Sequence, residues 1–173
     1  MKKSRSIVIT GFMGSGKTTI ADALARRLDC SMVDLDSFIA ECEGRTPARI
    51  IAEDGEPAFR EIESNALRDS LTQIEVGVIA LGGGAWTIAA NRQLIEQHDC
   101  VTVWLDAPFD LCWERIAGTS NSIRPLAPDR ELARELYNRR RSTYEMAALK
   151  VELDGSEDAA GVAARIQKEL DSQ

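Results

Sequence analysis

The chain has 173 residues, of which 44% are hydrophobic and 28% charged, so extensive disorder is excluded and one domain spanning residues 1–173 is expected. The net charge of −7 excludes a general attraction to nucleic acid or to anionic membranes. Four cysteines without Cys-x-x-Cys spacing and a single histidine indicate neither a zinc site nor a disulfide scaffold, so we expect buried free thiols.

The first predicted strand, residues 6–10, leads into residues 11–18, which fit the pattern Gly-x4-Gly-Lys-Ser/Thr, and a helical pattern follows over residues 19–28. Glycines permit positive φ, so backbone N–H groups and the start of the helix can surround polyphosphate oxygens. We expect Lys17 to contact the β- and γ-phosphates and Thr18 to bind Mg²⁺. A glycine turn that matches by chance is disfavoured because a strand and a helix flank it. The predicted nucleotide-binding residues of this loop are Gly14, Ser15, Gly16, Lys17, Thr18 and Thr19.

A short second strand over residues 31–33 ends at two carboxylates, Asp34 and Asp36. Residues i and i+2 project to the same side of an extended segment, and ligands of α/β proteins gather at the carboxyl ends of strands. We expect one acid to serve a metal ion and the other a substrate hydroxyl. The alternative is that Asp36 only caps a helix over residues 37–42.

Two helical patterns follow, over residues 47–54 and from residue 56 onward, separated by Gly55. Arg60 and Glu63 are i, i+3 neighbours in the second, so the carboxylate could hold the guanidinium group for an acidic ligand. On the residues alone, a solvated surface ion pair is the better interpretation.

The apolar residues 77–81 predict a strand buried on both faces, and three glycines at 82–84 follow it. Uncovered backbone amides there indicate the wall of a binding site rather than a flexible loop. A helix is predicted over residues 89–96 and a fourth strand over residues 101–105, with His98 an exposed residue between them.

After a helix over residues 110–117, the segment 118–128 is rich in Gly, Ser, Asn and Pro and carries one cation, Arg124. A mobile lid with an arginine is a recurrent device for excluding water from phosphoryl transfer, and a passive loop is the alternative. A long polar helix over residues 129–149 then carries three consecutive arginines at 139–141.

The last predicted elements are a strand over residues 150–153 and a helix over residues 156–170 that is capped by Ser156. The chain thus alternates strand and helix five times. This pattern predicts an α/β fold with a parallel sheet, helices on both faces and right-handed crossovers.

Together these motifs resemble the shikimate kinase family, and the resemblance covers nearly the whole chain. The motifs that carry it, besides the glycine loop, are Asp-Leu-Asp at 34–36, Gly-Glu-x-x-Phe-Arg-x-x-Glu at 55–63, Gly-Gly-Gly at 82–84, Trp-Leu-Asp-Ala-Pro at 104–108, Arg-Pro-Leu at 124–126 and Arg-x-x-x-Tyr at 140–144. The resemblance implies a P-loop kinase fold with five parallel strands in the order 2-3-1-4-5, a lid at about 118–128 and a substrate-binding region at about 34–63.

The resemblance also implies an activity, the ATP-dependent phosphorylation of the 3-hydroxyl of shikimate in the pathway toward chorismate and the aromatic amino acids. By similarity, Asp36 binds the reacting hydroxyl and accepts its proton, Asp34 positions Mg²⁺ through water, and Arg124 neutralises charge on the transferring phosphoryl group. We expect Arg115 to stack on adenine. The residues implied to bind shikimate are Asp36, Arg60, Gly82, Gly83, Gly84 and Arg140.

The chain departs from the family pattern at Ile51, where Phe is frequent, and at Ser142, where Pro is frequent. The choice among the arginines at 139–141 therefore stays open. The alternatives to shikimate phosphorylation are a kinase for gluconate or a nucleoside monophosphate, a non-catalytic ATP-binding module, and a nucleic-acid-dependent NTPase. Because no apolar stretch has the length of a signal peptide or membrane span, we expect a cytoplasmic protein, and the resemblance suggests a monomer.

Overall fold

The structure, a computed structural model, describes residues 5–73, 76–119 and 126–172. Within these residues, five strands form one parallel sheet in the order β2-β3-β1-β4-β5, as expected. The strands are β1 (Ile7–Thr10), β2 (Ser31–Asp34), β3 (Val76–Ala80), β4 (Val101–Asp106) and β5 (Leu149–Glu152). Every residue of β1 and β4 is buried because helices cover both faces of the sheet.

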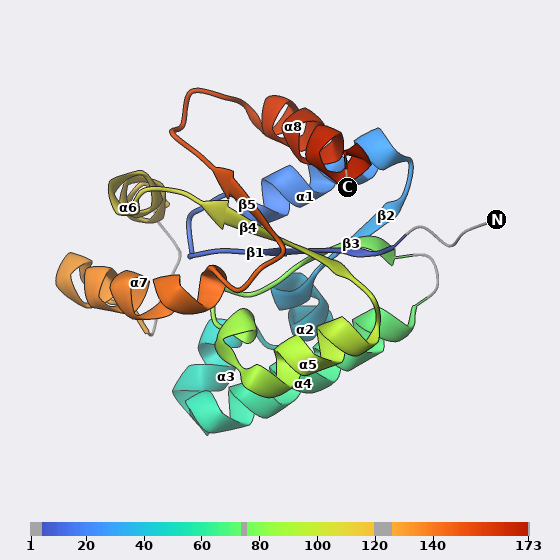
Figure 1. Cartoon of the computed structure of the whole chain (residues 1–173). Coiled ribbons are helices and arrows are strands. Elements are labelled where there is room, and N and C mark those ends of the chain that lie inside the picture. Colours follow the sequence, from blue (N-terminus) through green and yellow to red (C-terminus); the bar gives the residue numbers. More distant parts are fainter. Residues whose placement is uncertain (1–4, 74–75, 120–125, 173) are drawn as a thin grey trace.

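The helices form layers on the two faces of the sheet. One layer contains α1 (Lys17–Leu28) and α8 (Ala159–Asp171), and the other contains α2 (Leu35–Glu43), α3 (Pro47–Asp54), α4 (Glu56–Thr72) and α5 (Ala89–Gln97) (Figure 1). A 3-10 turn, η1 (Ala85–Thr87), precedes α5. None of the helices in the described part of the chain has the length and apolar composition of a membrane span.

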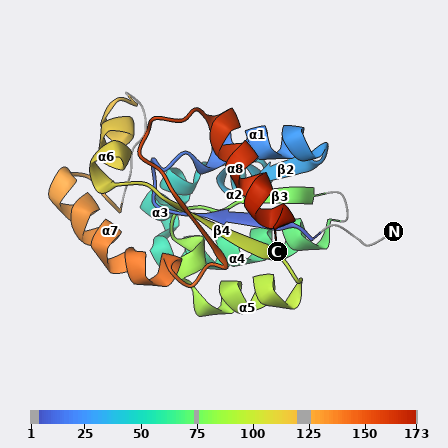
Figure 2. The same ribbon diagram turned by 45° about the horizontal axis from the view of Figure 1, so that its top comes forward.

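Helices α6 (Phe109–Ala117) and α7 (Arg130–Tyr144) lie at the carboxyl ends of the strands, on the left of Figures 1 and 2. The loops after β1, β2 and β3 open toward the same end of the sheet. This is the edge where open α/β folds bind ligands.

Several predicted boundaries were wrong for local reasons. Helix α2 begins two residues early because Asp34, rather than Asp36, caps it and accepts a hydrogen bond from the Ser37 amide. Asp36 therefore lies in the first helical turn and not on an extended segment. Helix α8 is capped by Asp158, whereas the predicted cap, Ser156, bonds to Asp154.

Helix α7 ends at Tyr144, five residues before the predicted end, because turns follow it and the Ala148 amide bonds to the Thr102 hydroxyl. The expectation of buried thiols holds only for Cys112, since Cys30 and Cys100 are half-buried and Cys42 is exposed. His98 is exposed after α5, as predicted.

Candidate active site

The loop between β1 and α1 has the backbone conformation that its glycines predict. Gly14 and Gly16 have φ of +77° and +93°, and a Cβ on Gly14 would lie 2.5 Å from the Cys112 carbonyl oxygen, so only glycine fits there. Gly16 caps α1, which directs the free amides of the helix start into a cavity of about 260 Å³. Lys17 lines this cavity and donates from Nζ to the carbonyl oxygens of Gly11 (2.9 Å) and Phe12 (3.0 Å).

Thr18 and Asp34 meet at the edge of this cavity, which we call the phosphate cavity because phosphate is the group that the glycine loop is expected to bind. The Thr18 hydroxyl donates to Asp34 Oδ2 across 2.5 Å, while Asp34 Oδ1 accepts from the Ser37 amide. Asp34 thus caps a helix and faces the glycine loop at the same time. The Ser15 side chain is fully buried, so the expected contact of Ser15 with the nucleotide would fall to its backbone amide and stays a prediction.

A second cavity, of about 120 Å³, collects the residues expected to bind the acceptor: Asp36, Arg60, Gly82, Gly83, Gly84 and Arg140. Apolar side chains complete its walls, among them Ile51 and Leu126. Met13, Asp36 and Gly83 line both this acceptor cavity and the phosphate cavity. A group bound in one is therefore adjacent to a group bound in the other.

Arg60 is not the solvated surface residue that its sequence pattern favoured. Its guanidinium group donates to Glu63 Oε2 (2.7 Å) and Glu56 Oε1 (3.0 Å), and Glu63 is only 1% exposed. Burial raises the pKa of Glu63, against the opposing effect of the neighbouring Arg60. Residue spacing could not reveal this burial, because it depends on how α4 packs against the loop at residues 82–84.

Arg140 lies in the acceptor cavity, whereas Arg139 is exposed and Arg141 turns toward Asp106. Arg140 is 7% exposed, and within the described ranges no carboxylate forms an ion pair with it. Burial accordingly lowers its pKa. A buried guanidinium group without a carboxylate partner favours binding of an anion.

Glycines 82 and 84 make room for these charged groups. A Cβ on Gly82 would lie 2.8 Å from both Asp36 Oδ1 and Glu63 Oε1, and a Cβ on Gly84 would overlap the Arg60 guanidinium group. The Tyr144 hydroxyl donates to the Gly83 carbonyl oxygen across 2.5 Å and ties α7 to this loop. The triple glycine therefore has a steric cause as well as uncovered amides.

A third cavity, of about 310 Å³, adjoins the phosphate cavity and shares Gly16 and Thr19 with it. Arg115 lines it and donates to the Gly14 carbonyl oxygen across 3.2 Å. The opposite wall is the turn between β5 and α8 with Gly155 at φ +84°, which sequence reasoning missed. The Asp-Gly pair at 154–155 was the available signal.

Arg124, expected on the lid, lies outside the described residues, as do residues 120–125 as a whole. Leu126, near the end of the expected lid segment, lines the acceptor cavity. The expectation that this segment closes over the site thus stays a prediction.

Comparison with known proteins agrees with this geometry. The family model described as "Shikimate kinase" matches residues 13–171. A shikimate kinase of Cereibacter sphaeroides is 38% identical over 96% of this chain and 82% of its own length, and one of Moorella thermoacetica is 40% identical over 95% and 94%. The solved structure of shikimate kinase from Acinetobacter baumannii in complex with shikimate superposes with a TM-score of 0.89 at 31% identity, covering 97% of this chain and 93% of that one. The chain therefore belongs to the shikimate kinase family.

Proposed function

We propose that this enzyme transfers the γ-phosphoryl group of ATP to the 3-hydroxyl of shikimate with the three adjoining cavities described above. The observation that carries the proposal is their order: the Arg115 cavity shares walls with the phosphate cavity, which shares Asp36 and Gly83 with the acceptor cavity. A nucleotide that spans the first two cavities would present its terminal phosphate to an alcohol in the third.

In the acceptor cavity, Arg60 and Arg140 would bind the carboxylate of shikimate together with the amides of Gly83 and Gly84. Planar guanidinium groups match a carboxylate in geometry, and Arg140 lacks a carboxylate of its own. Asp36 would then accept the proton of the 3-hydroxyl group while the oxygen of that hydroxyl group forms a bond to the γ-phosphorus. The bond from that phosphorus to the bridging oxygen breaks, and ADP leaves.

In the phosphate cavity, the loop amides and Lys17 would stabilise charge on the β- and γ-phosphates. Lys17 now donates to two loop carbonyl oxygens, so nucleotide binding would redirect its ammonium group. Arg115 would contact the adenine base, and Arg124 would neutralise charge on the transferring group, where such an arginine contributes about 10³–10⁵ in rate.

The residues present fit Mg²⁺ rather than a metal caged by protein alone. Thr18 and Asp34 bring two hard oxygen ligands within 2.5 Å of each other, and the described residues contain no group of three or more metal-binding His, Cys, Asp or Glu side chains. Mg²⁺ commonly keeps several waters and takes one or two protein oxygens plus phosphate. When bound, it would supply electrostatic stabilisation of the phosphate charge.

We also propose a cytoplasmic monomer with residues 34–63 as its substrate-binding region. Among the described residues, the large hydrophobic side chains that are exposed are Leu132 and Met146, on α7 and in the turn after it. A permanent dimer needs a larger apolar surface. Sedimentation velocity at micromolar concentration tests this, and a dimeric mass would contradict it.

The decisive test of the activity is ADP release by the purified protein with ATP, Mg²⁺ and shikimate, with gluconate and nucleoside monophosphates as alternative acceptors. We expect ADP release that depends on shikimate and that falls at least about 10²-fold in Asp36→Asn, because the variant loses its general base. Release with gluconate alone would favour the gluconate kinase alternative. Binding of ATP without turnover on any acceptor would favour a non-catalytic module.

A further inference from the structure

Helix α7 presents two rows of side chains to the rest of the protein. Tyr137 and Arg141, four residues apart, face the end of β4, whereas Arg140 and Tyr144 face the loop at residues 82–84. Successive residues of a helix are rotated by about 100° around its axis, so fixing one row fixes the direction of the other. The direction of Arg140 thus depends on what holds the row of Tyr137 and Arg141.

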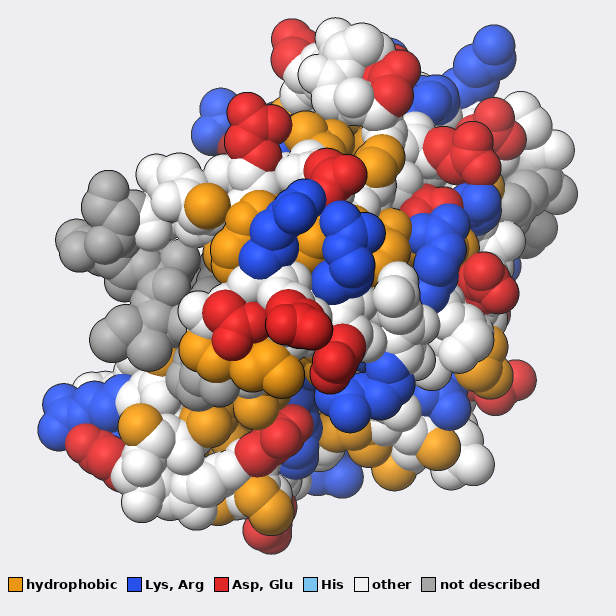
Figure 3. Space-filling view, turned by 90° about the vertical axis from the view of Figure 1, so that its left-hand side faces the viewer, with side chains coloured by type: hydrophobic (Ala, Val, Ile, Leu, Met, Phe, Trp, Pro, Cys, Tyr) orange, Lys and Arg blue, Asp and Glu red, His pale blue; other side chains and the backbone are white. Residues whose placement is uncertain are grey.

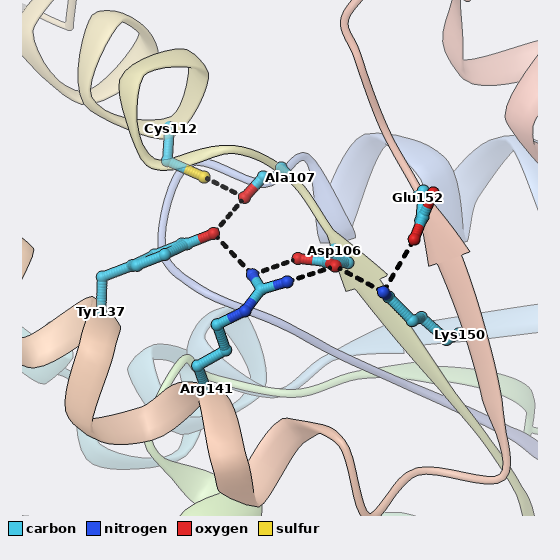
Figure 4. Close-up of polar contacts among 7 residues, drawn as sticks. All are labelled: Asp106, Ala107, Cys112, Tyr137, Arg141, Lys150 and Glu152. Atoms are coloured by element: carbon cyan, nitrogen blue, oxygen red, sulfur yellow. Dashed lines mark hydrogen bonds and ion pairs between the residues drawn. The ribbon is translucent and has the colours of Figure 1, made fainter.

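Arg141 holds that row to Asp106, the last residue of β4. Its two terminal nitrogens donate to the two carboxylate oxygens, with Nη1–Oδ1 at 2.5 Å and Nη2–Oδ2 at 2.7 Å (Figure 4). Nη1 also donates to the Tyr137 hydroxyl (2.8 Å), which in turn donates to the Ala107 carbonyl oxygen (3.0 Å). A two-point bond of this kind fixes orientation as well as distance.

Asp106 is a rigid anchor because it belongs to the sheet. It is 8% exposed, its carbonyl oxygen accepts the Leu153 amide (3.0 Å), and its carboxylate also pairs with Lys150 (3.1 Å) (Figure 4). Removing the Arg141 side chain would therefore leave Asp106 paired with Lys150. Because the buried carboxylate keeps this partner, a variant without the Arg141 side chain should fold.

Aromatic side chains also contact the basic residues of this region. The Arg141 guanidinium carbon lies 5.1 Å from the Trp104 ring centroid, and Lys150 Nζ lies 5.3 Å from it. Arg134, about two turns earlier in the same row of α7, stacks on Phe109 at 4.2 Å. Figure 3 shows basic side chains lying over hydrophobic ones on the corresponding side of the molecule.

The two acceptor-binding arginines differ in how they are held. Arg60 is tied by Glu63 and Glu56, whereas Arg140 pairs with no carboxylate of the described segments and has the Tyr144 hydroxyl as its neighbour. Its placement then follows the rotation of the helix. We propose that Arg141 is a positioning residue, whose two-point bond to Asp106 sets the rotation of α7 and thereby directs Arg140 at the carboxylate of the acceptor.

This inference rests on the proposed function, and the test separates the two. In Arg141→Met, we expect the KM for shikimate to rise about tenfold, since small displacements at a binding site cost up to about 10²-fold. The KM for ATP should stay within about twofold. The variant keeps the hydrogen bond from the Leu153 amide to the Asp106 carbonyl oxygen, which holds the turn that lines the Arg115 cavity. Arg141→Lys, which keeps the charge but not the fork, should recover only part of the affinity.

Arg134→Met is the matched control. It removes an arginine from the same helix face, about two turns before Arg141, together with an ion pair to Asp110 (3.0 Å) and a ring contact, but within the described residues Arg134 forms no ion pair with Asp106. We expect its thermal midpoint to fall no further than that of Arg141→Met and the KM for shikimate to stay unchanged. Equal KM values in the two variants would overturn the proposal.

The Arg140→Met background gives the second control. There, adding Arg141→Met should raise the KM for shikimate no further, because the residue that is positioned is gone. A further tenfold rise in that background would show that Arg141 acts by another route. If Arg140→Met alone left the KM unchanged, the proposed carboxylate contact would fail and the positioning role with it. An inactive wild type would instead contradict the proposed function.

Discussion

Arg60 donates from Nη1 to the carboxylate of Glu63 across 2.7 Å, and Glu63 is almost wholly buried. The acid lies in the wall of the acceptor cavity, and the guanidinium group stands beside Gly84, where a Cβ would overlap it. Glu63, which does not line the phosphate cavity, therefore orients Arg60, one of the two arginines of the acceptor cavity.

Loss of the Glu63 side chain should destabilise the folded protein. We expect Glu63→Ala to lower the free energy of unfolding by about 2–3 kcal/mol, below the usual cost of breaking a buried pair because Arg60 keeps Glu56 and some contact with solvent. Urea denaturation at pH 7 measures it. Glu53→Ala is the control, since Glu53 pairs with two arginines at an exposed site, and the loss of stability there should be much smaller. Equal losses would contradict a buried pair.

Gly84→Ala tests the steric role of the triple glycine. The added methyl group would displace the end of the Arg60 side chain, which can move, so we expect a folded protein. The KM for shikimate should rise about tenfold or more, while the KM for ATP is unchanged, because displacement of a positioned group weakens only what it binds. Gly161→Ala, on α8, should leave both unchanged. Steady-state kinetics measures both values. A parallel rise of the KM for ATP and the KM for shikimate in Gly84→Ala would contradict the steric role.

Removal of Mg²⁺ should abolish turnover without unfolding the protein. The described residues offer no metal cluster that the fold would depend on, so EDTA should leave the thermal midpoint unchanged. Asp34→Asn should raise the Mg²⁺ concentration for half-maximal rate about tenfold with little loss of stability, since asparagine also caps helices well. A midpoint that falls on chelation would point to a structural metal instead.

Cys112 gives a prediction about alkaline pH. Burial raises the pKa of its thiol from 9.0 to about 11, so the folded state favours the neutral form. Between pH 9 and pH 11 the unfolded chain loses this proton first, and stability must fall as pH rises, by up to about 2–3 kcal/mol. Urea denaturation across this range should show a shallower decline for Cys112→Ala. Identical slopes would mean that the thiol is accessible to water.

Sequence patterns were most informative where a function depends on a continuous stretch of chain. The glycine loop needs positive φ at Gly14 and Gly16, which only glycine adopts readily, and the alternation of apolar strands and helices fixes a parallel sheet. The same holds for Asp34, although its capping of α2 and the helical place of Asp36 were not foreseen.

Contacts between distant segments were decided by the tertiary structure alone. The burial of Glu63, the choice of Arg140 over its two neighbours and the bond from Arg141 to Asp106 each depend on how helices pack against the ends of strands. Residue spacing gives the face of a helix but not what that face meets, because the rotation of a helix is set by partners far away in the sequence. The sequence by itself thus determined the fold, the glycine loop and the family, whereas packing decided which charges are buried and which arginine lines the acceptor cavity.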